Sequence, residues 1–132
     1  MTERPIDIIR RVYDGWSQGD FSRGAELFDD GTVFVLQSHF ADAGIYVGPE
    51  QMQRYMRGLL EPWERLTITP LELTQAGDNV VAKVKQSGAG ARSGAITSFT
   101  YFQIWTLRGG TLMRLENIID REKIVEALGA DF

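Results

Sequence analysis

The stretch SFTYFQIWTLRGGTLMRLENII, residues 98–119, decides the fold of this chain. Two runs rich in aromatic and β-branched residues flank the glycine pair at 109–110, which is the pattern of a β-hairpin. Successive side chains of a strand point to opposite faces, so the first run sorts into two sets. One set is Phe99, Tyr101, Gln103 and Trp105.

The length of the turn decides which residues of the returning strand meet this aromatic set. A two-residue turn would bring Arg114 and Glu116 onto the aromatic face, because a shift of one residue exchanges the two faces of a strand. A three-residue loop over 108–110, with Gly110 left-handed, keeps both charges off it. We therefore expect the three-residue loop.

The three-residue loop places a phenol and two amides among large apolar side chains. It pairs Gln103 with Leu115 and Tyr101 with Asn117. A buried polar group without a partner costs about 1–3 kcal/mol, so these groups need each other, water or a ligand. A satisfied core network and a ligand pocket both fit, since small-molecule sites use such groups to orient an apolar ligand. The expected wall is Phe99, Tyr101, Gln103, Trp105, Met113, Leu115, Asn117 and Ile119.

The rest of the chain predicts helices first and antiparallel strands afterwards. Pro5 opens a helix over 5–18, Asp20 can cap a second short helix, and Pro49 opens a third whose apolar stripe runs to Trp63. Strands are expected at 32–37, 66–74, 79–87, 95–107 and 111–119, with a flexible loop at 87–94 and a closing helix capped by Asp120. This order is typical of an α+β domain with a curved sheet of about four to six strands.

Length and composition indicate one domain, residues 1–132, and limit the classes of partner. The net charge of −4 disfavours nucleic acid and anionic membranes as partners, since both are bound through an excess of Lys and Arg. No run approaches the roughly 20 apolar residues of a membrane span, and no signal peptide is recognisable at the N-terminus. The absence of cysteine excludes disulfides and thiolate sites. We expect a cytoplasmic protein.

Four segments resemble the nuclear transport factor 2-like superfamily, in its SnoaL-like (polyketide cyclase) and ketosteroid isomerase branch. They are VYDGWSQGDFSRGAELFDDGTV at 12–33, GPEQMQRYM at 48–56, AGDNVVAKV at 76–84 and IWTLRGGTLMRLENIIDREK at 104–123. The resemblance implies N-terminal helices packed in a strongly curved, mixed, mostly antiparallel sheet that forms a cone-shaped barrel with an internal pocket. It also implies that the aromatic wall faces this pocket. The fold carries isomerases, cyclases, dehydratases, epoxide hydrolases and non-catalytic binding proteins.

The catalytic residues that this resemblance implies are mostly absent. The tyrosine of a ketosteroid isomerase aligns with Val12, its general base with Val35, and its hydrogen-bonding aspartate with Gln103. The isomerase mechanism is therefore disfavoured. The epoxide hydrolase mechanism is also disfavoured, because no aspartate occurs between 79 and 119, and the dehydratases rely on two histidines where this chain has one.

The candidate proton carriers are His39 and Asp42, in the loop after the first strand. Histidine is the side chain whose ordinary pKa lies nearest neutrality, so His39 is the default general base and Asp42 could orient it or act itself. The simpler interpretation of the pair is an exposed loop histidine beside a solvated aspartate. The pair offers too few ligands for a metal, and no cofactor is expected. The expected ligand-binding residues are Trp16, Val35, Tyr55, Trp63, Phe99, Tyr101, Gln103, Trp105, Leu115, Asn117 and Ile119.

Two functions remain open. One is a SnoaL-like enzyme of the lyase, isomerase or hydrolase kind, acting on an apolar substrate with a carbonyl or hydroxyl group. The other is a non-catalytic binding or accessory domain that holds a small apolar molecule or a partner. The outer faces of the last two strands would leave apolar side chains exposed, which suggests a homodimer. These are Phe102, Ile104, Leu112 and Ile118.

Overall fold

The computed structural model describes residues 3–36, 43–119, 121–122 and 124. Its helices are α1 (Pro5–Trp16) and α2 (Gly48–Leu60), with a short 3-10 helix η1 (Ala25–Leu27). Its strands are β1 (Val33–Leu36), β2 (Gly44–Val47), β3 (Trp63–Ala76), β4 (Asn79–Gly90), β5 (Ile96–Arg108) and β6 (Thr111–Ile118). The α+β class is confirmed.

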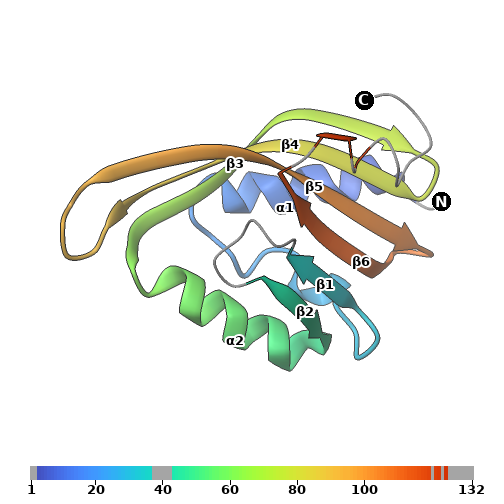
Figure 1. Cartoon of the computed structure of the whole chain (residues 1–132). Helices are drawn as coiled ribbons and strands as arrows, with labels where there is room; N and C mark the ends of the chain where they lie inside the picture. The colour runs from blue at the N-terminus through green and yellow to red at the C-terminus, as the bar shows by residue number, and fades with distance from the viewer. Residues whose placement is uncertain (1–2, 37–42, 120, 123, 125–132) are drawn as a thin grey trace.

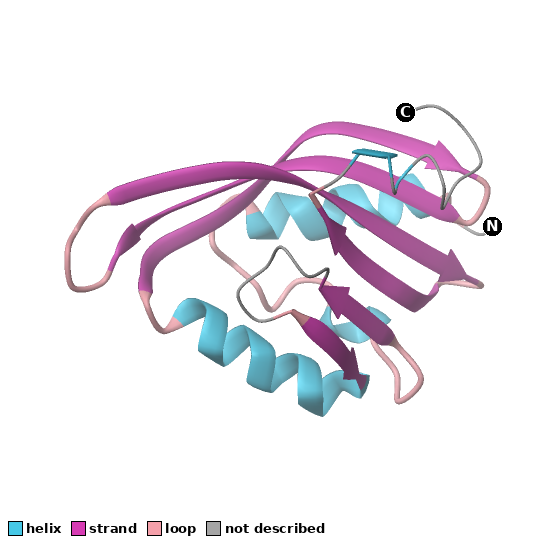
Figure 2. Ribbon diagram, in the orientation of Figure 1, coloured by secondary structure: helices cyan, strands magenta, loops and turns pink. Residues whose placement is uncertain are grey.

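The strands form one curved sheet in the order β2-β1-β6-β5-β4-β3. The described pairs are antiparallel except β1–β6, which is parallel. The sheet arches over α1, and α2 crosses its open side beside β2 (Figures 1 and 2). The expected mixed, mostly antiparallel sheet is confirmed, but β2 and β3 are edges, so hydrogen bonds between the described strands do not close the cone into a barrel.

Helix α1 begins at Pro5, which has the fixed φ of a first helical position, and buries one apolar stripe against the sheet. It ends at Trp16, before Gly19, whose φ of 84° is outside the helical range. The helix predicted over 5–18 is therefore confirmed with a slightly earlier end. The buried residues are Ile6, Ile9, Val12, Tyr13, Gly15 and Trp16.

Four features of the predicted secondary structure differ from the observed one. The second helix is only the 3-10 turn η1, and β2 was expected to be loop. Helix α2 ends at Leu60, because Pro62 cannot continue a helix, so Trp63 begins β3 rather than closing the helical stripe. Strand β4 extends to Gly90, which shortens the loop that was predicted over 87–94. The predicted cap Asp120 lies outside the described residues.

The β5–β6 hairpin has a two-residue turn, so the three-residue loop is wrong. Arg108 pairs with Thr111 across the glycine pair 109–110, whose φ values of 61° and 81° fit the two left-handed positions of a type I′ turn. Two adjacent glycines permit this turn without a steric penalty, whereas the prediction assigned a left-handed conformation to one of them.

A β-bulge after the turn restores the expected faces. The register shifts between Thr106 and Leu107, which leaves Met113 as the extra residue of β6. Beyond the bulge Gln103 pairs with Asn117, not with Leu115 as predicted. The side chains expected on the aromatic face of β5 and those expected opposite them on β6 still lie on one face of the sheet. The extra residue of the bulge compensates for the turn, which is one residue shorter than predicted. Met113 does not join the wall and is 41% exposed.

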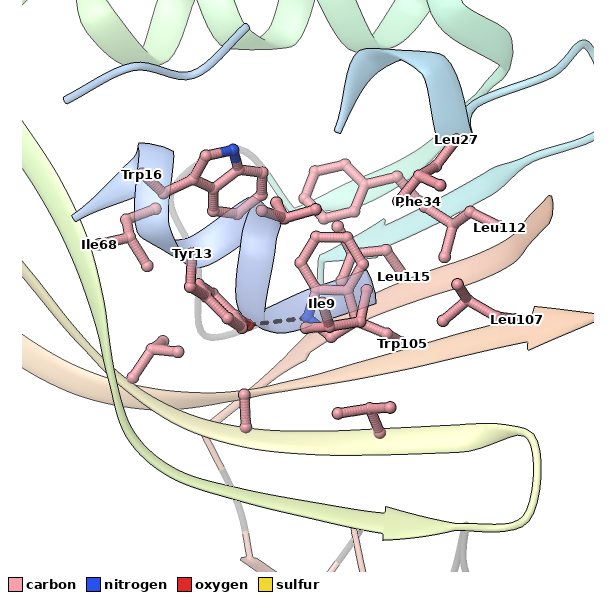
Figure 3. Close-up of a cluster of buried hydrophobic side chains, with 14 of the residues drawn as sticks. Ile9, Tyr13, Trp16, Leu27, Phe34, Ile68, Trp105, Leu107, Leu112 and Leu115 are labelled. Carbon is pink, nitrogen blue, oxygen red and sulfur yellow. Dashed lines mark hydrogen bonds between the residues drawn. The ribbon is translucent and has the colours of Figure 1, made fainter. Parts of the chain in front are cut away.

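The main core lies between α1 and the concave face of the sheet (Figure 3). Its centre is a group of three rings, in which Tyr13 makes edge-to-face contacts with Trp16 and Trp105 at centroid distances of 5.7 Å each. Such contacts are the preferred geometry of aromatic pairs. The labelled members are Ile9, Tyr13, Trp16, Leu27, Phe34, Ile68, Trp105, Leu107, Leu112 and Leu115.

The convex face of the sheet is not the exposed apolar surface that the sequence suggested. Ile104 and Ile118 are buried in a second cluster with Val81 and Ile124, and Phe102 packs against it. Leu112 is turned into the main core next to the bulge. Ile124 therefore covers part of this face, and the homodimer stays a prediction that no longer rests on an exposed apolar sheet face.

Candidate functional site

A chain of buried hydrogen bonds explains the polar residues of the aromatic wall. The indole Nε1 of Trp105 donates to the hydroxyl of Tyr13 at 2.7 Å (Figure 3). That hydroxyl donates to Oε1 of Gln103 at 2.6 Å, and Nε2 of Gln103 donates to Oδ1 of Asn117 at 3.0 Å. Gln103, on β5, therefore connects α1 and β6 through side-chain hydrogen bonds. This explains why an amide stands between two aromatic residues of the strand.

The direction of this chain is fixed at its first member. An indole N–H can only donate, so the Tyr13 oxygen accepts from Trp105 and gives its own hydrogen to Gln103. The amide of Gln103 must then place oxygen toward Tyr13 and nitrogen toward Asn117. This requires the Asn117 oxygen to accept, which leaves the Asn117 amide N–H groups as the free end. Amide orientation is otherwise ambiguous, and here the indole resolves it.

This free end lies in a cavity of about 310 Å³, the inner pocket, between α2 and the concave face of the sheet. Strand β3 has a bulge between Glu64 and Thr67, where Arg65 has a left-handed φ of 56°. The bulge bends the strand close to its first residue, Trp63. The lining residues are Leu36, Tyr55, Gly58, Leu59, Pro62, Trp63, Gln86, Phe99, Tyr101 and Asn117.

Two amides offer hydrogen-bond donors to the inner pocket. The hydroxyl of Tyr101 donates to Oε1 of Gln86 at 2.9 Å, which leaves the Gln86 amide nitrogen, like that of Asn117, able to donate. The described lining residues include no carboxylate, imidazole or amine. Burial raises the pKa of Tyr101, and it raises the pKa of Tyr13 well above its usual value, so both phenols are neutral at physiological pH.

The structure brings together part of the predicted binding set. The predicted residues that line the inner pocket are Tyr55, Trp63, Phe99, Tyr101 and Asn117. Those that lie behind this lining, in the core, are Gln103, Trp105 and Leu115.

Other predicted residues lie elsewhere. Trp16 borders a different cavity, and Ile119 is 42% exposed. Val35, predicted as a ligand-binding residue, pairs with Glu116 and alternates with the buried Phe34 and Leu36. The residue of β1 that lines the pocket is Leu36. The candidate proton carriers at 39 and 42, His39 and Asp42, lie outside the described residues.

Gln86 is the functional candidate that the sequence interpretation missed. Its strand alternates, and the inward positions Val80, Ala82 and Val84 are fully buried. A glutamine that continues such an apolar series is the same signal that marked Gln103. Gln86 lies within the strand predicted over 79–87, but the predicted binding residues include none from that strand.

The part of the chain that the structure describes contains no cluster of three or more His, Asp or Glu residues able to hold a metal ion. Within the same residues, no helix is both long enough and apolar enough to cross a membrane.

Several solved structures have this fold. TerC, crystallised with polyporic acid, is 19% identical with a TM-score of 0.74, and the match covers 96% of this chain and 98% of TerC. A nuclear transport factor 2-like protein from Burkholderia thailandensis is 22% identical with a TM-score of 0.79, covering 96% and 98%. A protein from Jannaschia sp., provisionally named as a SnoaL-like polyketide cyclase, is 22% identical with a TM-score of 0.73, covering 100% and 99%. At these identities the likeness establishes the fold alone.

Comparison with proteins of curated function gives no significant match. Residues 9–115 match the family model described as SnoaL-like domain, a span that covers most of the chain. The resemblance expected from the sequence motifs is thereby confirmed, and the protein belongs to the SnoaL-like domain family.

Proposed function

We propose that this SnoaL-like domain binds a small, largely apolar molecule that carries a carbonyl or other acceptor oxygen in the inner pocket. The observation that carries the proposal is the direction of the buried hydrogen-bond chain, which ends in the amide N–H groups of Asn117 at the pocket. The volume of about 310 Å³ is near the lower end of the roughly 300–1,000 Å³ typical of small-molecule sites.

The lining residues divide into two roles. Tyr55, Trp63 and Phe99 offer apolar surface for the body of the ligand, while Asn117 and Gln86 donate to its oxygen. Residues behind the lining contribute by holding the Asn117 amide in one orientation, which removes the entropy cost of orienting it on binding.

Catalysis by the same site is the second candidate, as a cofactor-independent cyclase or a related lyase, isomerase or hydrolase. The provisional naming of the Jannaschia protein as a polyketide cyclase favours it. His39 and Asp42 are the candidate proton carriers, and His39 follows the pocket residue Leu36 by three positions. The lining residues that the structure describes carry no charge, which favours binding as the primary function, with a non-catalytic accessory domain as the alternative.

A matched pair of ligands tests the proposal. 2-Acetylnaphthalene and 2-ethylnaphthalene have nearly the same shape, but only the ketone has an acceptor oxygen. One hydrogen bond contributes about 0.5–1.5 kcal/mol net, so isothermal titration calorimetry should show the ketone binding about two- to tenfold more tightly. Asn117→Leu should reduce this preference, and circular dichroism checks that the variant is folded. Equal affinity of wild-type protein for both compounds would refute the proposal.

A further inference from the structure

A second cavity, of about 420 Å³, lies between α2 and the segment that follows α1. We call it the α2 groove. Among the residues that the structure describes, none lines both this groove and the inner pocket. Its apolar surface comes from Trp16, Phe21, Phe28, Pro49, Met52 and Met56.

The apolar side chains of α2 line two separate cavities. Tyr55 and Leu59 line the inner pocket, whereas Met52 and Met56, on the neighbouring side of the helix, line the groove. Met56 is only partly buried, and methionine adapts well to ligands of varied shape.

The opposite wall of the groove is held firmly in place. The indole Nε1 of Trp16 donates to the carbonyl oxygen of Arg23 at 3.0 Å, which ties the segment after α1 back onto the helix. The same indole packs between Phe21 and Trp105, at centroid distances of 5.7 Å and 5.4 Å. Figure 3 shows Trp16 at the edge of the core cluster. The aromatic surface of the groove is therefore built before any ligand arrives.

The charged groups on the groove are of one sign. Arg23 and Arg57 both line it, and no carboxylate does so among the described residues. Arg23 has one long ion pair with Asp20, at 3.6 Å, in which both side chains are more than half exposed. Arg57 forms no salt bridge with any residue that the structure describes. An apolar floor with guanidinium groups at its side complements an amphipathic anion, because guanidinium pairs well with carboxylate.

We propose that the α2 groove binds a medium-chain alkyl or aryl carboxylate. The apolar chain lies on Trp16, Met52 and Met56, and the carboxylate pairs with Arg23 and Arg57. This site differs from the inner pocket in location and in ligand, since the described residues of the inner pocket offer uncharged donors to an acceptor oxygen.

Octanoate and 1-octanol provide the test, because they share a chain and differ in charge. Calorimetry on the full chain should show octanoate binding several-fold more tightly than octanol. Arg57→Gln and Arg23→Gln should each weaken octanoate binding about three- to tenfold and leave octanol binding within twofold, since partly exposed ion pairs are screened by water. The matched control is Arg54→Gln, which removes an exposed charge of α2 that pairs with Glu50 and does not line the groove.

Three outcomes would overturn the inference. The first is equal binding of octanol and octanoate, or no octanoate binding at millimolar concentration. The second is an equal loss in Arg54→Gln, which would indicate only long-range attraction by net positive charge on α2. The third is octanoate binding that is lost in Asn117→Leu but unchanged in the two groove variants. That result would place the carboxylate in the inner pocket, and it would leave the proposed function standing.

Discussion

Replacing Tyr13 with Phe tests the chain of buried hydrogen bonds that ends at the inner pocket. The substitution keeps the ring and its edge-to-face contacts but leaves two buried atoms without partners, the indole nitrogen of Trp105 and Oε1 of Gln103. Their residues are 0% and 2% exposed, so water cannot reach these atoms without local opening. At about 1–3 kcal/mol for each orphaned group, the expected loss of unfolding free energy is about 2–6 kcal/mol.

This loss is large beside the roughly 5–15 kcal/mol of a typical domain, so it should be plain in guanidinium chloride denaturation followed by tryptophan fluorescence. Tyr101→Phe is the matched control, because it also removes one phenolic hydroxyl. The described hydrogen bond that it removes is the one to Oε1 of Gln86, which borders the inner pocket where water can replace the hydroxyl, so a loss of about 1 kcal/mol or less is expected.

Tyr13→Phe should also change ligand preference, although Tyr13 does not line the inner pocket. Without the hydroxyl, nothing fixes the Gln103 amide, and Asn117 becomes free to present its oxygen instead of its nitrogen. The preference for 2-acetylnaphthalene over 2-ethylnaphthalene should therefore shrink. A variant that loses less than about 0.5 kcal/mol, below the usual worth of even one hydrogen bond, would contradict the chain as described.

Three further predictions concern the turn, the tyrosines and the outer cluster. Gly110→Ala should destabilise the protein by about 1–2 kcal/mol in thermal unfolding, because its φ of 81° is left-handed. Gly58→Ala in α2, where an added Cβ meets no atom within 4 Å, should instead stabilise it by about 0.5–1 kcal/mol. A Gly110→Ala variant as stable as the wild-type protein would argue against the turn. The raised pKa values of Tyr13 and Tyr101 mean that the unfolded chain releases these protons first, so stability should be full below about pH 10 and fall above it by about 1.4 kcal/mol per pH unit for each tyrosine. Absorbance of tyrosinate checks this, and titration of all tyrosines near pH 10 in the folded protein would contradict it. Ile124→Ala should cost about 2–5 kcal/mol in chemical denaturation, because this side chain is fully buried against Val81 and Ile118, and a cost near zero would show that the convex face is not covered there.

The sequence predicted the inner face of the sheet because strand alternation is a strong signal. Tyr101, Gln103 and Asn117 were expected on one face and lie there, although the turn and the register beyond it were wrong. The length of the turn and the position of the bulge depend on where the hairpin can accommodate one extra residue at the lowest cost in free energy. Packing against the rest of the protein determines this position, and the local sequence pattern does not.

The partner of Gln103 could not be predicted in the same way. Tyr13 was expected on a buried helical stripe, but its reach across the core to Gln103 depends on how α1 lies on the sheet. Val35 was placed on the pocket by alignment with a relative, and the residue that faces the pocket proved to be Leu36. A one-residue error on a strand reverses the side of the sheet on which a side chain lies.

The bulge at Met113 separates the tip of the hairpin from the part that supports the site. Deleting Met113 would convert the bulge to regular pairing while Trp105 still faced Leu115 and Gln103 still faced Asn117. Homologous hairpins that differ in length by one residue here can thus conserve the same binding chemistry. An alignment gap at this position is therefore no sign of a changed ligand.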